Sequence, residues 1–195
     1  MSPSRLEAYS DAVIAIIITI MVLELRPPGS AALADLLPVL PTFLSYVLSF
    51  VFLSIYWNNH HHLLRATKRI NGAIMWANIH LLFWLSLIPF TTSWLSEQPG
   101  QTWPTALYGI NLLMAAVAYT ILTFAIIAHE GKDSRLASVV GPDIKGNLSL
   151  LFYVLSIGLA FVNTLFSYIL FVVVALIWLR PDRRTERIAR QHQER

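Results

Sequence analysis

The sequence predicts an all-α polytopic membrane protein with six transmembrane helices, and its composition and the spacing of its apolar runs support this. Of its 195 residues, 56% are hydrophobic and only 13% are charged, and the mean hydropathy is +0.60. A soluble domain carries about 25% charged residues, so this composition is typical of a chain that lies mostly in lipid. The apolar runs reach about 20 residues, the length that an α-helix needs to cross the hydrocarbon core of a bilayer.

Proline and glycine separate these runs into candidate helices, most clearly at 27–29 and 99–100. The run 147–179 is too long for one ordinary span, and Asn163 with its neighbour at 164 interrupts it. We expect two short helices there, either tilted or shielded from lipid by protein. The predicted membrane helices cover 6–25, 36–62, 71–96, 103–129 and two segments within 147–179 that meet near 161–164.

The cationic residues are distributed unequally about the predicted spans. Six spans place both termini on the same side of the membrane, and every Lys and Arg except Arg26 falls on that side. Because cytoplasmic loops are enriched in Lys and Arg, we expect a multi-pass protein of the cytoplasmic (inner) membrane with both termini in the cytoplasm. The expected organisation is one six-helix membrane domain over 1–180 and a basic cytoplasmic tail over 181–195.

The basic tail predicts contact with lipid headgroups at the bilayer surface, and nucleic acid is not an expected partner. The first apolar run also resembles a cleaved signal peptide. Asp11 inside the run, and Glu24 and Arg26 after it, favour a helix that is retained. The chain contains no cysteine, so it has neither disulfides nor thiolate metal sites.

The first predicted helix has two different faces. At about 100° per residue, one face is almost entirely apolar, whereas Ser10 and Asp11 point away from it. Ordinary packing or lipid contact is the first interpretation of this face, and a pore lined by rings of Ile and Leu that gate by dewetting is the second. Periodicity does not separate the two. We define this first-helix stripe as Arg5, Tyr9, Ala12, Ile16, Thr19 and Leu23, with Ile20 at its edge.

Asp11 lies at membrane depth, where an ionisable side chain is costly and usually faces protein or water. One interpretation is structural, in which Asp11 accepts hydrogen bonds from a histidine, a tryptophan N–H or Arg5. The other is functional, in which Asp11 is a proton or cation site. The sequence leaves both open.

Four histidines suggest either a titrating group or a metal site. His60, His61 and His62 are adjacent, so their side chains diverge by about 100° each on a helix. They could converge on one ion only if His80 or Asp11 joined them, and no H-E-x-x-H or Glu-x-x-His motif accompanies them. We therefore expect no resident metal or cofactor. Hydrogen bonding between helices is the simplest role for these histidines, and titration near neutral pH is the next.

Several functional classes are argued against by the motifs that the sequence lacks. It has no phosphate-binding G-x-x-x-x-G-K-[ST], no G-x-G-x-x-G and no G-x-S-x-G. It also has no T-V-G-Y-G, which excludes a potassium channel with a carbonyl filter.

The first helix closely resembles the signature of the transmembrane protein 175 family, which comprises bacterial and lysosomal cation channels. The matching elements are Arg5-x-x-x-Tyr9-Ser10-Asp11, Ala15-Ile16-x-x-Thr19 and Leu23-Glu24-Leu25, then Tyr56-Trp57-x-x-His60-His61, Asn78 and Pro89-Phe90-x-Thr92. Tyr9 stands where the family usually has Phe, so its added hydroxyl needs a partner.

The resemblance implies a leak channel, not an enzyme, that favours potassium modestly over sodium and whose bacterial copies assemble as tetramers. The first helix of each copy would line the central pore. Ile16, Ile20 and Leu23 would form rings that gate the pore, and Thr19 would be the polar ring near which potassium passes. We call these four residues the pore positions.

The resemblance also implies a group of polar side chains that holds the pore helix in place. The members of this anchoring network are Arg5, Ser10, Asp11, Trp57, His60 or His61, and Asn78. Two alternatives to a potassium channel stay open. One is a proton-conducting leak that uses Asp11 and the histidines, and the other is a membrane-embedded metal enzyme that uses 60–62 and His80.

Overall fold

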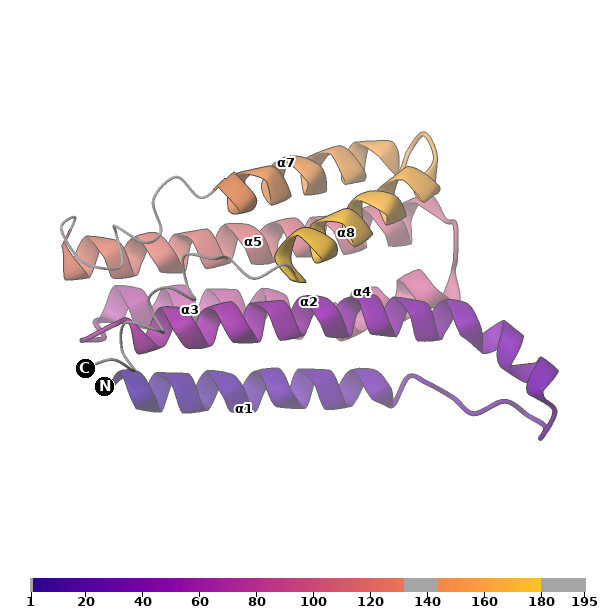
Figure 1. Cartoon of the computed structure of the whole chain (residues 1–195), viewed down its shortest axis with the longest axis horizontal. Helices are drawn as coiled ribbons and strands as arrows, with labels where there is room; N and C mark the ends of the chain where they lie inside the picture. Colours follow the sequence, from indigo (N-terminus) through magenta and orange to yellow (C-terminus); the bar gives the residue numbers. More distant parts are fainter. Residues whose placement is uncertain (1, 132–143, 180–195) are drawn as a thin grey trace.

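The computed structural model describes residues 2–131 and 144–179, and Figure 1 shows them as a bundle of helices that run roughly side by side. Within these ranges the chain contains helices and no strands, which confirms the prediction of an all-α fold. The helices are α1 (Pro3–Val22), η1 (Leu33–Val39), α2 (Leu40–Arg65), α3 (Gly72–Ser86), α4 (Ile88–Glu97), α5 (Thr102–Glu130), α7 (Ile144–Leu159) and α8 (Thr164–Leu179).

Two of the predicted spans are each built from a pair of consecutive helices. The 3-10 helix η1 contains Pro38 and continues directly into α2, which has Pro41 in its first turn. Between α3 and α4 only Leu87 interrupts the helix, because Pro89 lacks the N–H that would continue the backbone ladder. Six helical rods result: α1, η1 with α2, α3 with α4, α5, α7 and α8.

The predicted helix bounds differ from the observed ones by a few residues. α1 begins at Pro3, a residue that suits the first helical position, and it ends at Val22 in place of 25. The N–H groups of Glu24 and Leu25 bond to carbonyls three residues back, so the last turn tightens before the chain leaves the helix. The predicted division of 147–179 is confirmed, since α7 and α8 are separated by a turn at 160–163.

By length and composition, three segments of the described chain can cross a membrane: Leu33–Arg65, Gly72–Glu97 and Thr102–Glu130. α1 has the necessary length but carries Arg5, Glu7 and Asp11. α7 and α8 have 16 residues each, or about 24 Å of helix, against a hydrocarbon core of about 30 Å. These three rods therefore depend on tilt or on protein contacts to lie in a bilayer.

Two hydrophobic clusters form the interior. One joins α1, α2, α3, α4 and α5, and the other joins α2, α4, α5, α7 and α8. α1 packs against α2, α3 and α4, and Figure 1 shows it at the edge of the bundle, on the opposite side from α7. One face of α1 is therefore left without a partner among the described residues of its own chain. The predicted basic tail, 181–195, lies outside the described residues.

Candidate functional site

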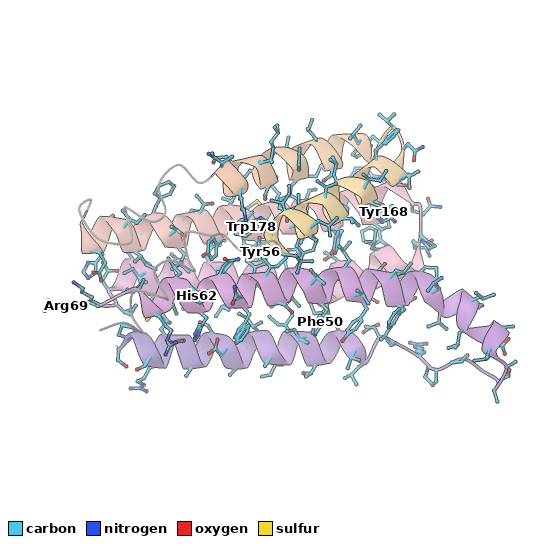
Figure 2. All side chains as sticks on the ribbon, in the orientation of Figure 1. Phe50, Tyr56, His62, Arg69, Tyr168 and Trp178 are labelled. Carbon is cyan, nitrogen blue, oxygen red and sulfur yellow. The ribbon has the colours of Figure 1, made fainter. Side chains whose placement is uncertain are left out.

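α1 presents one face to the bundle and leaves the other uncovered. Its buried residues are spaced by three or four positions, which places them on one side of the helix: Leu6, Ser10, Ile14, Ile17 and Met21. The pore positions lie on the other side, where Ile16 is 57%, Ile20 46% and Leu23 77% exposed. Figure 2 shows the side chains along this edge of α1 projecting away from the bundle.

Thr19 is exposed among these aliphatic side chains. Its hydroxyl donates a hydrogen bond to the carbonyl of Ile16 at 2.9 Å. The proton of the hydroxyl is thus used by the backbone, and the oxygen lone pairs remain free to accept a hydrogen bond or to coordinate a cation.

A fully buried chain of hydrogen bonds attaches the inner face of α1 to α2 and α3. The amide nitrogen Nδ2 of Asn78 donates to Ser10 Oγ at 2.9 Å, and Ser10 Oγ donates to the carbonyl of Leu6 at 2.8 Å. On its other side, Asn78 Oδ1 accepts from His60 Nε2 at 2.6 Å. Ser10, Asn78 and His60 have no exposed surface, so each bond is made away from water, where an unpaired polar group is costly.

A second, partly exposed set of contacts lies beside the first, at the same level of the bundle, and joins α1 to α2. The indole Nε1 of Trp57 donates to Asp11 Oδ1 at 3.0 Å. His61 Nδ1 lies 2.7 Å from Glu7 Oε1, and the rings of Trp57 and His61 stack at 6.0 Å. Glu7 and Asp11 are four residues apart, as are Trp57 and His61, so two neighbouring side chains on one helix face two on the other.

The structure brings together most of the residues predicted to anchor the pore helix. Arg5 is the exception, because it is exposed and its side chain has no hydrogen bond or ion pair to a described residue. Glu7 was missed by the sequence reasoning, although its spacing of four from Asp11 was a usable signal. Because Glu7 lies in the first turns of α1 beside Arg5, it had the pattern of an ordinary surface charge.

The histidines do not form the single cluster that a metal enzyme would require. His80 accepts a hydrogen bond from Trp84 within α3 at 2.9 Å, and His62 is exposed near the end of α2 (Figure 2). Among the described residues, the group whose geometry could hold a metal ion is Glu7, Asp11 and His61, whose ligand atoms lie within 4.8 Å of one another. Here His61 and Trp57 already contact the two carboxylates, so ion-pair and hydrogen-bond partners explain the group.

A helical bundle with membrane-spanning segments and a polar network that fixes an edge helix defines a polytopic membrane protein. Comparison with known proteins gives the family. Residues 5–89 match the family model described as "Endosomal/lysosomal potassium channel TMEM175". A potassium channel of Chryseobacterium sp. (strain P1-3) is 49% identical over 192 residues, which cover 98% of this chain and all of the relative. The chain therefore belongs to the TMEM175 family.

Two further relatives extend this result. The crystal structure of a lysosomal potassium-selective channel TMEM175 homolog from Chamaesiphon minutus matches with a TM-score of 0.78 at 25% identity, covering 91% of this chain and 96% of that one. The endosomal/lysosomal proton channel TMEM175 of Danio rerio is 29% identical over 67% of this chain and 25% of its own length. Membership of an ion-channel family confirms that the chain is a membrane channel and not an enzyme.

Proposed function

We propose that this chain is one subunit of a homotetrameric, potassium-permeable leak channel of the cytoplasmic membrane, with both termini in the cytoplasm. Four α1 helices surround the pore, and the permeant potassium is cargo, so no resident cofactor is needed. The observation that carries this proposal is the uncovered face of α1, where bulky aliphatic residues project away from a helix that is firmly held on its other side. The potassium channels among its relatives support the choice of ion.

The gate in this proposal is a set of aliphatic rings. Four copies each of Ile16, Ile20 and Leu23 offer no oxygen ligand to a dehydrated ion, so a narrow pore dewets and closes while a wider one passes hydrated ions. Thr19 supplies a ring of hydroxyl oxygens between them. One polar ring gives modest selectivity for potassium over sodium, in contrast to a filter made of several carbonyl layers.

The hydrogen bonds to Ser10 and Asp11 support this gate by holding α1 against α2 and α3. A pore helix must keep its rotation, since a turn of 100° would replace one residue of the stripe by its neighbour. The buried bonds lie in the half of α1 that precedes the pore positions. They fix one end of the helix and leave the other end freer to tilt.

Potassium flux from liposomes tests the gate. Ile16→Asn, which wets the ring, and Leu23→Ala, which widens it, should each raise potassium efflux by about tenfold over the unsubstituted protein. Ile121→Asn and Leu151→Ala make the same chemical changes at exposed positions of α5 and α7 and should leave the flux unchanged. Unchanged flux in both gate variants would contradict the proposal.

The subunit number is tested separately. The chain has a mass of 22.0 kDa, and native mass spectrometry of the detergent-solubilised protein should give a complex of four chains. A monomer that still conducts potassium would exclude a central pore between copies of α1.

A proton-conducting leak is the second candidate, and the partly exposed contacts of Glu7, Asp11 and His61 favour it. These titratable groups lie within 4.8 Å of one another at the start of α1, and the relative from Danio rerio is named a proton channel. Asp11→Asn keeps an oxygen to accept from Trp57 but removes the titratable group. It should abolish a pH-driven current if Asp11 passes protons, and it should leave potassium flux intact if the contact is only structural.

A further inference from the structure

Glu24 is a carboxylate that directly follows the most exposed pore position. It lies just past the end of α1, next to Leu23, and its side chain is exposed. A surface groove between α1 and the α3–α4 rod runs from Ile16 and Ile20 to Glu24 and Ser93. The carboxylate thus lies at the end of the same groove that contains two of the gate residues.

One contact fixes this carboxylate and leaves its charge in place. Ser93 Oγ of α4 donates to Glu24 Oε2 at 3.0 Å. No Lys, Arg or His in the described part of the chain lies within ion-pair distance of Glu24. A neutral hydroxyl donor does not cancel a negative charge, so the carboxylate is oriented, and no described residue compensates its charge at the end of the groove.

The surrounding end of the bundle is negative. In the described residues at this end, where α1, η1 and α4 meet the connecting turns, the carboxylates are Glu24, Asp35 and Glu97, and the only Lys or Arg is Arg26. The described residues of the opposite end include Arg5, Arg65, Lys68 and Arg69. An ion approaching Glu24 therefore meets a net negative potential, which attracts cations and raises their local concentration.

We infer that four copies of Glu24 form a ring at the outer mouth of the pore that concentrates monovalent cations before they reach the ring of Leu23. This inference rests on the proposed tetramer. Rings of Asp or Glu at a pore mouth favour cations over anions through their charge, without coordinating a dehydrated ion. Glu24 therefore sets the supply of cations and their preference over anions, whereas Thr19 would act on potassium against sodium.

Glu24→Gln separates this role from a structural tether. The glutamine keeps an oxygen that can accept from Ser93 and removes only the charge, while Ser93→Ala breaks the tether and keeps the charge. Glu97→Gln removes a second carboxylate at the same end of the bundle, at the last residue of α4 and outside the groove lining, and serves as the comparison. The Leu23→Ala background, which opens the gate, makes single-channel currents measurable in all three variants.

The measurement is the unitary conductance at about 0.1 M and about 1 M KCl, where the Debye lengths are about 10 Å and 3 Å. Glu24→Gln should lower the conductance by about threefold at the lower salt concentration. The loss should be larger when cations enter the pore from the Glu24 side than when they enter from the other side. It should vanish at the higher salt concentration. Ser93→Ala should change the conductance little at either concentration, and Glu97→Gln, which does not line the groove, should lower it less than Glu24→Gln does.

Three results would overturn the inference. In the first, Glu24→Gln has the same unitary conductance as the Leu23→Ala background at both KCl concentrations. In the second, Glu24→Gln lowers the conductance by the same factor at both concentrations. That second result is the one expected if the Ser93–Glu24 hydrogen bond serves only as a structural tether. In either case the channel itself still conducts, and the proposed function stands. An absence of potassium current in the Leu23→Ala background would instead reject the proposed function, and the ring with it.

Discussion

The two faces of α1 carry the same kinds of apolar residue and differ in what surrounds them. Ile17 on the inner face is 4% exposed and packs among residues of its own chain, whereas Ile16, the next residue, is 57% exposed. The inner face also holds Ser10, whose hydroxyl is engaged on both sides. The outer face has Thr19, whose hydroxyl, among the described residues, bonds to its own helix alone.

The difference teaches that the polar residues of α1 serve attachment and that its apolar residues serve two purposes. Inward-facing apolar groups are covered by α2, α3 and α4. Outward-facing ones have little cover among the described residues, and in the proposed tetramer they face the pore. A substitution should therefore affect stability on the inner face and conduction on the outer face, and neighbouring residues can be used to separate these effects.

The largest expected difference is between Ile17→Ala and Ile16→Ala. Truncation of the buried Ile17 leaves a cavity and should destabilise the protein by about 3 kcal/mol, whereas truncation of the exposed Ile16 should cost less than about 0.5 kcal/mol. Ile16→Ala should instead raise potassium flux. Melting temperatures in detergent and efflux from liposomes measure the two effects, and equal melting temperatures would show that the inner face does not hold the helix.

The next effect concerns the buried hydrogen bonds. Asn78→Leu nearly conserves side-chain volume but leaves Ser10 and His60 without their partner, which should destabilise the protein by about 2 kcal/mol. Asn58→Leu makes the same change at an exposed position of α2 whose side chain bonds to no described residue, and it should not lower the melting temperature. A shift of equal size in both variants would mean that the buried bonds contribute little, as is found for some bonds between membrane helices.

The division of α1 into two faces was predictable because burial in a packed helix follows the 3.6-residue period. The first-helix stripe defined from spacing is exposed at its pore positions, and Ser10 points to the interior. The breaks at 27–29 and 160–163 were also predictable, since Pro, Gly and Asn disfavour a continuing helix. Local backbone preferences act within a few residues and are therefore visible in sequence.

The pairing of polar side chains was not predictable to the same degree, because it depends on the rotation of three helices about one another. Sequence left His60 and His61 as alternatives, whereas in the structure His60 bonds to Asn78 and His61 contacts Glu7. The sequence pattern also grouped Arg5 with residues that the Arg5 side chain does not contact within the described part of one chain. A residue at the start of an edge helix can face solvent, lipid or a second subunit, and its spacing is the same in each case.

A smaller effect is expected where α1 meets α2 in partly exposed surroundings. Trp57→Phe keeps the ring that stacks on His61 and removes the N–H that bonds to Asp11, which should cost about 0.5 kcal/mol because water can replace the lost donor. Trp76→Phe, at an exposed position of α3 where the indole bonds to no residue that the structure describes, is the matched control. A loss as large as that of Asn78→Leu would show that both sets of contacts hold α1 equally.

The smallest expected effect belongs to Thr19, and it should appear in selectivity alone. Thr19→Val is isosteric and removes the oxygen that can coordinate a passing cation, so the ratio of potassium to sodium permeability should fall by about twofold towards unity. Thr19→Ser keeps the hydroxyl and should keep the ratio, and neither variant should melt differently, since the side chain is exposed. Reversal potentials under potassium and sodium gradients measure the ratio. An unchanged ratio in Thr19→Val would assign selectivity to another part of the pore and leave the outer face of α1 with gating alone.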